Sequence, residues 1–244
     1  MKLTRNVLVF GVLAVTAMPV AAQQGKSGEL SIEEAYLKES VPLMIIREQA
    51  QSGDRESKLL ALDYIRESMD AGEKSDSMRV VLQDLALEGI LNTTRSEGRV
   101  TNNYSDVRMR AVAYLGELGT KEASEALKKV VVVEEEPAVI TEAFRSLAKI
   151  GINENGSTVD TANWIFQRFN SINPDNRLAV SYLDAVETFL PTMQQNTENE
   201  KRIYSDALDK IRSIATNFKY ITHVRDRARA VLMSLAKKSG GSGK

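Results

Sequence analysis

The 244-residue sequence contains no cysteine. This absence excludes disulfide bonds, thiolate metal sites, cysteine nucleophiles and a lipid-modified N-terminal cysteine. A single histidine, His223, leaves no second imidazole for a histidine-rich zinc site, and a lone histidine at a helix start is more often structural than catalytic. Neither glycine-rich phosphate-binding pattern occurs. We therefore expect no catalytic residues, no metal site and no cofactor.

Aromatic residues and an excess of one charge are also lacking. Aromatic side chains make up 6% of the sequence, and 32 Lys and Arg residues stand against 33 Asp and Glu residues. A charge balance so close to zero gives no electrostatic basis for binding nucleic acid. The low proline content and the 43% of hydrophobic residues favour a folded chain built from helices rather than sheets. The expected fold class is therefore all-α.

The N-terminal residues have the pattern of an export signal. Lys2 and Arg5 flank the start of the chain, an apolar run covers 6–20, and small residues lead up to Ala22. This order is typical of a signal peptide, so we expect cleavage after Ala22. The apolar run is short for a bilayer span, which needs about 20 residues, so we expect no stable membrane insertion after cleavage. The alternative is an uncleaved N-terminal anchor.

Signals for helix ends are dense in the rest of the chain. Ser31 with Glu34 three residues later forms a capping box, and the helix that it begins should kink or restart at Pro42. The β-prone run 130–133 continues a helical pattern. Four glycines follow apolar-periodic runs, where a helix C-terminus favours a residue that tolerates positive φ: Gly53, Gly72, Gly119 and Gly151.

A short pattern that begins with alanine recurs five times. A larger Tyr, Leu or Ile stands three and four residues after most copies, on the same face of a helix. The spacings of 32 and 36 residues fit a two-helix repeat, and those of 50 and 49 fit a repeat with an inserted loop. Alanine lets neighbouring helices approach closely while the larger residues fill the groove between them. The marker alanines are Ala61, Ala111, Ala143, Ala179 and Ala228.

The central copies resemble the HEAT-repeat family. The first unit carries the pattern Asp106-Val107-Arg108, Ala111, Leu115-Gly116, Leu118-Gly119, Ala123, Ala126 and Leu127. The next unit has Val139, Ala143, Leu147, Ile150 and Gly151, and the C-terminal unit keeps Val224-Arg225, Ala228, Leu232 and Leu235. The resemblance implies a right-handed α-solenoid of four to five HEAT-like helix pairs. It also implies that the Asp caps its helix and that Arg108 and Arg225 link adjacent units.

The expected organisation has four parts and two insertions. Polar stretches at 92–105 and 192–200 should be loops inserted into the repeats, often found on one edge of such an array. The four parts are a signal peptide at 1–22, an N-terminal helical segment at 23–52, a HEAT-like repeat domain at 53–238 and a flexible tail at 239–244.

Two polar runs have both a structural and a functional interpretation. The acidic run 134–136 can be a cation-binding or docking patch, but we favour a solvated turn whose carboxylates stabilise the next helix N-terminus. The run 153–157 faintly resembles a calcium loop. It lacks the length and the final acid, so we interpret it as a turn.

Four residues are predicted to bind a partner. Trp164 and Arg168 are four residues apart and share one stripe of the second helix of their unit, a helix that the HEAT resemblance places on the concave surface. Lys128 and Lys129 lie off the apolar stripe of the preceding second helix. Trp and Arg are the residue types in which interface energy concentrates. The alternative is that Trp164 packs between repeats.

The function that these patterns favour is a non-catalytic protein–protein interaction scaffold. It would bind a protein partner through the concave second-helix face and the inserted loops, and the resemblance implies a bacterial periplasm or cell envelope as its setting. One alternative is a permanent structural subunit of an envelope assembly, such as a secretion or flagellar apparatus. Another is a HEAT-like enzyme, which the missing cysteine and the single histidine disfavour.

Overall fold

The computed structural model describes residues 41–240 of the chain. The expected signal peptide at 1–22, the capping box at Ser31 and the final four residues of the expected tail lie outside the described residues. Of the expected N-terminal helical segment, the part from Val41 onward is described and is helical.

Helices make up 76% of the described residues, which confirms the expectation of a mostly helical protein. The α-helices are α2 (Val41–Gln51), α3 (Arg55–Asp70), α4 (Asp76–Ala86), α5 (Ser105–Leu118), α6 (Lys121–Val133), α7 (Pro137–Ile150), α8 (Ser157–Ile172), α9 (Asn176–Phe189), α10 (Glu198–Thr216) and α11 (Thr222–Gly240). The shorter elements are β1 (Arg95–Ser96), β2 (Arg99–Val100), and the 3₁₀ turns η1 (Glu154–Gly156) and η2 (Leu190–Thr192).

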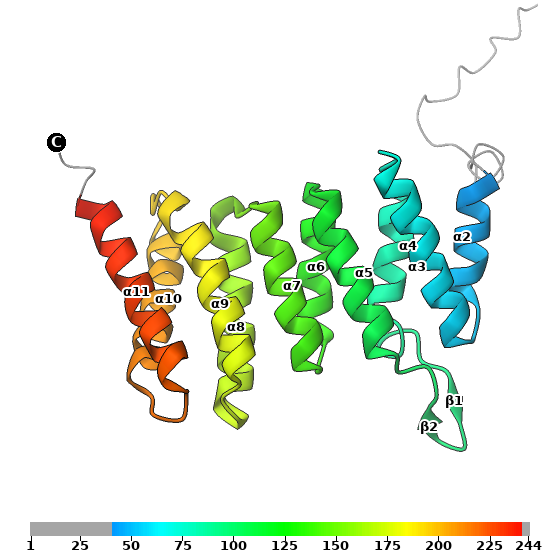
Figure 1. The fold of residues 1–244 in the computed structure, drawn as a ribbon. Helices are drawn as coiled ribbons and strands as arrows, with labels where there is room; N and C mark the ends of the chain where they lie inside the picture. The colour runs from blue at the N-terminus through cyan, green and yellow to red at the C-terminus, as the bar shows by residue number, and fades with distance from the viewer. Residues whose placement is uncertain (1–40, 241–244) are drawn as a thin grey trace, which may run out of the picture. The chain divides into compact units, whose positions relative to one another are not determined.

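These helices form two layers, and the chain alternates between them (Figure 1). The first layer consists of α3, α5, α7, α9 and α11, and helices that follow one another in this order are in contact. In the second layer the same holds for α2, α4, α6, α8 and α10. Each first-layer helix except α11 is therefore followed in sequence by a second-layer helix.

The marker alanines define the first layer. Each of the five is fully buried, and each lies on a different first-layer helix, from Ala61 on α3 to Ala228 on α11. The helices α5 and α7 approach each other closely at Gly116 and Ser146. A Cβ atom added at Gly116 would lie 2.6 Å from the Ser146 side chain, and the Ser146 hydroxyl donates to the Val112 carbonyl at 3.0 Å. Small side chains are required there because the two backbones nearly touch.

The tyrosines that follow the marker alanines behave unequally. Tyr182 is fully buried, stacks on Phe166 at 4.5 Å between ring centroids and donates to Asn163 Oδ1 at 2.7 Å. Tyr114 is half-buried, and Tyr64 is 38% exposed. The expectation that these side chains fill the groove between helices is therefore correct for Tyr182 and wrong for Tyr64.

All four predicted glycines follow the end of a helix, and three of them have a positive φ. Gly72, Gly119 and Gly151 follow α3, α5 and α7 with φ angles of 86°, 71° and 76°, which favour glycine. Gly53 follows the end of α2 at Gln51 as predicted, but without a positive φ. The next helix begins directly after it, because the Asp54 carboxylate accepts the Ser57 N–H at 2.8 Å as the N-cap of α3.

The two inserted stretches differ from simple loops. The first contains the antiparallel hairpin β1–β2, which the sequence analysis interpreted as loop. The second is shorter than expected, because Thr197 and Glu200 form a capping box and α10 begins at Glu198. The first joins a second-layer helix to a first-layer helix and the second does the reverse, so they lie at opposite ends of the helices rather than on one edge (Figure 1).

Glu134 corrects the interpretation of the acidic run as solvated. Its side chain is 1% exposed, and one carboxylate oxygen lies 2.8 Å from Arg108 Nε. The other oxygen accepts the N–H groups of Glu135 and Glu136, both at 2.9 Å. The neighbouring Glu135 side chain is exposed, as expected. This buried ion pair connects α5 to the turn before α7.

Of the residues expected to link units or cap a helix, only Arg108 connects two separate elements as expected, and Arg225 and Asp106 do not have the expected roles. Arg108 also donates to the Glu88 carbonyl at 3.1 Å, so it connects α5 to the segment after α4 as well. Arg225 instead donates to Thr222 in its own helix, so it makes no such link. Asp106 is not the N-cap of α5, because that position belongs to Tyr104; the Asp106 carboxylate pairs with Arg55 at 2.5 Å.

Candidate interaction surface

The four predicted residues lie on two neighbouring second-layer helices. Lys128 and Lys129 belong to α6, and Trp164 and Arg168 belong to α8. These two helices contact each other, so residues 35 or more positions apart in sequence share one surface.

Trp164 is on the surface of the protein. It is 53% exposed, which excludes the alternative that it packs between repeats. The Arg168 guanidinium lies 5.9 Å from the Trp164 ring centroid and 5.1 Å from that of Phe169. Arg168 also donates to the Val132 carbonyl at 3.2 Å and lies 3.6 Å from the Glu135 carboxylate. The indole is therefore held beside a cation whose position is fixed from two helices.

The two lysines differ in accessibility. Lys128 has a side chain that is only 14% exposed, with its ammonium 2.5 Å from the Glu125 carboxylate and 3.1 Å from the Ser157 hydroxyl. Lys129 is exposed. Lys128 therefore connects α6 to α8, whereas the Lys129 side chain is accessible to solvent.

A groove of about 580 Å³ lies beside these residues on the second layer. Its apolar part includes Leu91 and Val132, which are 61% and 45% exposed. Thr161 lines the groove on the α8 side and stands one helical turn before Trp164, whose indole does not itself line the groove. The remaining lining residues are Gln83, Leu87, Glu125, Lys128, Lys129 and Val133.

The hairpin is anchored next to this groove. Leu91 also lines a polar cleft between the α2–α3 turn and the hairpin segment. In that cleft Lys58 and Glu88 form a buried ion pair at 3.2 Å, and Asn102 donates to Glu88 at 2.7 Å. Asn102 also accepts the Thr94 N–H at 2.8 Å. The first insertion is therefore fixed at the border of the second-layer groove.

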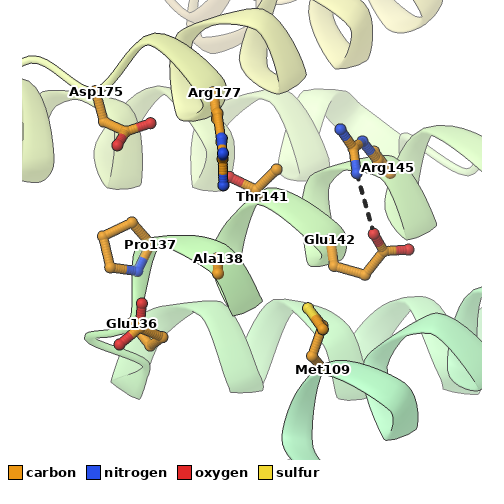
Figure 2. Close-up of a pocket in the computed structure, with 9 residues that line it drawn as sticks. All are labelled: Met109, Glu136, Pro137, Ala138, Thr141, Glu142, Arg145, Asp175 and Arg177. Carbon is orange, nitrogen blue, oxygen red and sulfur yellow. Dashed lines mark hydrogen bonds and ion pairs between the residues drawn. The ribbon is translucent and has the colours of Figure 1, made fainter. Parts of the chain in front are cut away.

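A second groove, which the sequence did not predict, lies on the first layer. It has a volume of about 430 Å³ and is lined by Met109 on α5, Arg177 on α9 and several residues of the turn before α7 and of α7 itself (Figure 2). Thr141 on its wall is 6% exposed, and its hydroxyl has no hydrogen-bond partner. No pattern in the sequence marked this groove, because Thr141 is one of several small polar and apolar residues that α7 buries.

Comparison with known proteins gives no family assignment. No protein-family model matches the sequence, and no curated protein matches it significantly. The HEAT resemblance thus stays a prediction. Between residues 41 and 240, no helix combines the length and the apolar character of a membrane span. Across the same residues, no three His, Cys, Asp or Glu side chains gather closely enough to hold a metal ion.

Proposed function

We propose that this protein is a non-catalytic scaffold that binds a partner protein through its second layer. The proposed surface consists of Leu91, Lys129, Val132, Trp164 and Arg168, and is called the α6–α8 surface below. It brings exposed apolar and aromatic side chains together with two cations.

We also propose that the helices form a right-handed α-solenoid of HEAT-like pairs. The alternation of the chain between two layers supports this, as does the placement of one marker alanine on each first-layer helix. The link from Arg108 to Glu134 is a further support, because it joins one helix pair to the next. In such an array the second-layer face is accessible over several units.

One observation carries the binding proposal: the only tryptophan is about half exposed beside an apolar groove. Covering a large aromatic side chain that is exposed to water is favourable by about 25 cal/mol per Å² of apolar area. Contiguous exposed apolar patches on soluble proteins often mark interaction sites. Tryptophan and arginine are enriched among the residues that dominate interface energies.

The setting that we propose is the bacterial periplasm or cell envelope. The support is the sequence pattern at residues 1–22, with two cations, an apolar run and small residues before the cleavage point. In that setting the partner would be another envelope protein, bound reversibly by a scaffold. Permanent binding would make the protein a structural subunit instead.

Photo-crosslinking in the producing cell tests the surface directly. A benzoylphenylalanine at position 164 should form a covalent adduct with one discrete protein, because that side chain would be covered by the partner. The matched control is position 218, where Phe218 is 89% exposed on the α10–α11 turn. Equal adducts from both positions, or none from 164, would argue against the α6–α8 surface.

A further inference from the structure

Thr141 has a buried hydroxyl that forms no hydrogen bond. Helical threonines usually donate to the carbonyl four residues earlier. Thr161, Thr188 and Thr216 do so in this protein, at 2.9, 2.9 and 3.0 Å. For Thr141 that carbonyl belongs to Pro137, and no such bond is made. A buried polar group without a partner destabilises the folded state, so its presence calls for an explanation.

The groove around Thr141 contains one unpaired cation. Arg177 is exposed and forms no ion pair with the described residues, whereas Arg145 pairs with Glu142 at 3.3 Å. In Figure 2 the hydroxyl end of Thr141 points toward Arg177. A guanidinium beside a hydroxyl offers several N–H donors and one O–H donor, which together suit the two oxygens of a carboxylate.

The other lining residues of the groove restrict the polarity and the charge of a ligand that could bind there. Met109, which is 39% exposed, lies with Pro137 and Ala138 as an apolar part of the wall. The methionine side chain is flexible and adapts to aliphatic groups. Glu136 and Asp175 also line the groove, so a ligand with several negative charges would be repelled. One oxygen of the Asp175 carboxylate accepts the Leu178 N–H at 2.8 Å as the N-cap of α9.

We propose that this first-layer groove binds an extended peptide segment with one acidic residue next to an aliphatic one. The carboxylate lies against Arg177 and receives a hydrogen bond from the Thr141 hydroxyl, once the exposed Arg177 side chain shifts to uncover that buried hydroxyl. The aliphatic side chain covers Met109. This site is separate from the α6–α8 surface and does not depend on it.

The probe is N-acetyl-Leu-Glu-amide, titrated to about 10 mM because a dipeptide binds weakly. The readout is the NMR signal of the 13C-labelled methyl group of Met109 in the full chain. We expect a saturable shift with the Glu peptide and at least about fivefold weaker binding of N-acetyl-Leu-Gln-amide, which lacks the charge. An equal response to both peptides, or no response to either, would overturn the proposal.

Four variants separate the effect on ligand binding from the effect on stability. Thr141→Val keeps the side-chain shape and removes the unpartnered hydroxyl, so the melting temperature should rise while binding of the Glu peptide weakens about threefold or more. Thr141→Ser should retain binding. Arg177→Gln should abolish it, whereas the exposed Lys219→Gln on the α10–α11 turn should not. Unchanged binding in Thr141→Val, or a lower melting temperature, would refute the assigned role of the hydroxyl.

Discussion

Burial of the tyrosines that follow the marker alanines differs from one helix to the next. Tyr182 on α9 lies between α7 and α11 and is buried. Tyr64 occupies the equivalent position on α3, which has a first-layer neighbour only on the α5 side among the described residues. The pattern in the sequence thus predicts which face is apolar. It cannot predict how far neighbouring helices cover a given side chain, because Tyr114 on α5 is only half-buried although it has first-layer neighbours on both sides.

The first prediction concerns the equivalent core positions Leu115 and Leu147. Both are buried, at 0% and 1% exposure, so truncation of either to Ala should cost about 2–5 kcal/mol through lost contacts and a cavity. Glu125→Gln should change the free energy of unfolding by no more than about 0.5 kcal/mol, because that side chain is 51% exposed. Denaturant titration of the three variants measures the difference. Similar costs for all three would show that the repeat register is wrong.

The burial of the Glu134 side chain was not predictable from the sequence. Three consecutive glutamates before Pro137 have the composition of a solvated turn. The carboxylate is buried because Arg108, 26 residues earlier, reaches it from another helix. Only the packing of α5 against the following turn creates that pairing.

The second prediction compares this residue with its neighbour. Glu134→Ala should lower the free energy of unfolding by about 3–5 kcal/mol, since it leaves Arg108 buried without its counter-charge. Glu135→Ala is the matched control, with a side chain that is 86% exposed, and should cost no more than about 0.5 kcal/mol. Thermal or chemical unfolding would distinguish them. A cost for Glu134→Ala as small as that of the control would contradict the buried pairing.

At the scale of elements, the long helices are predictable and the hairpin is not. Helix ends at Gly72, Gly119 and Gly151 follow local rules, because a positive φ there depends on the glycine itself. The strands of the hairpin have two residues each, too few for a periodic signal. The hairpin segment is held instead by Asn102, whose hydrogen bonds to Glu88 and to the Asn92 carbonyl span 14 and 10 residues.

The third prediction tests that anchor. Asn102→Ala removes the bonds that hold the hairpin segment, so backbone amides at 93–101 should exchange with solvent faster than in the unaltered protein. Amides of α7 and α9 should keep their protection. Thr101→Ala, which loses one exposed hydroxyl contact at 3.2 Å, serves as the control. Unchanged exchange in Asn102→Ala would show that other contacts fix the hairpin.

At the scale of the whole molecule, the sequence placed the predicted residues on two adjacent helices of one layer. The sequence indicates that Lys129, Trp164 and Arg168 are accessible, because each lies off the apolar stripe of its own helix. Lys128 was less predictable, since its ion pair and its contact with α8 are tertiary. The first-layer groove was not predictable at all. It combines Met109 from α5 and Arg177 from α9 with several residues of α7, which only the packing of the three helices brings together.

The fourth prediction concerns export. The chain purified from its natural source should lack residues 1–22, because the signal pattern ends at Ala22. Intact-mass spectrometry of that protein, fractionated from the cell envelope, gives the answer. A chain that retains Met1 in the cytoplasmic fraction would contradict the proposed location while leaving the binding surface open to test.

The central claim is that binding energy resides in the α6–α8 surface, and a pair of double variants tests it most directly. Trp164→Ala with Arg168→Ala should weaken binding of the crosslinked partner by at least about 2 kcal/mol, with a much smaller fall in thermal stability. Phe218→Ala with Arg225→Ala is the matched control, because Arg225 lies 5.0 Å over the exposed Phe218 ring in the same kind of pair. Calorimetric titration should show normal binding for the control. Equal affinity of both double variants for the partner would contradict the account.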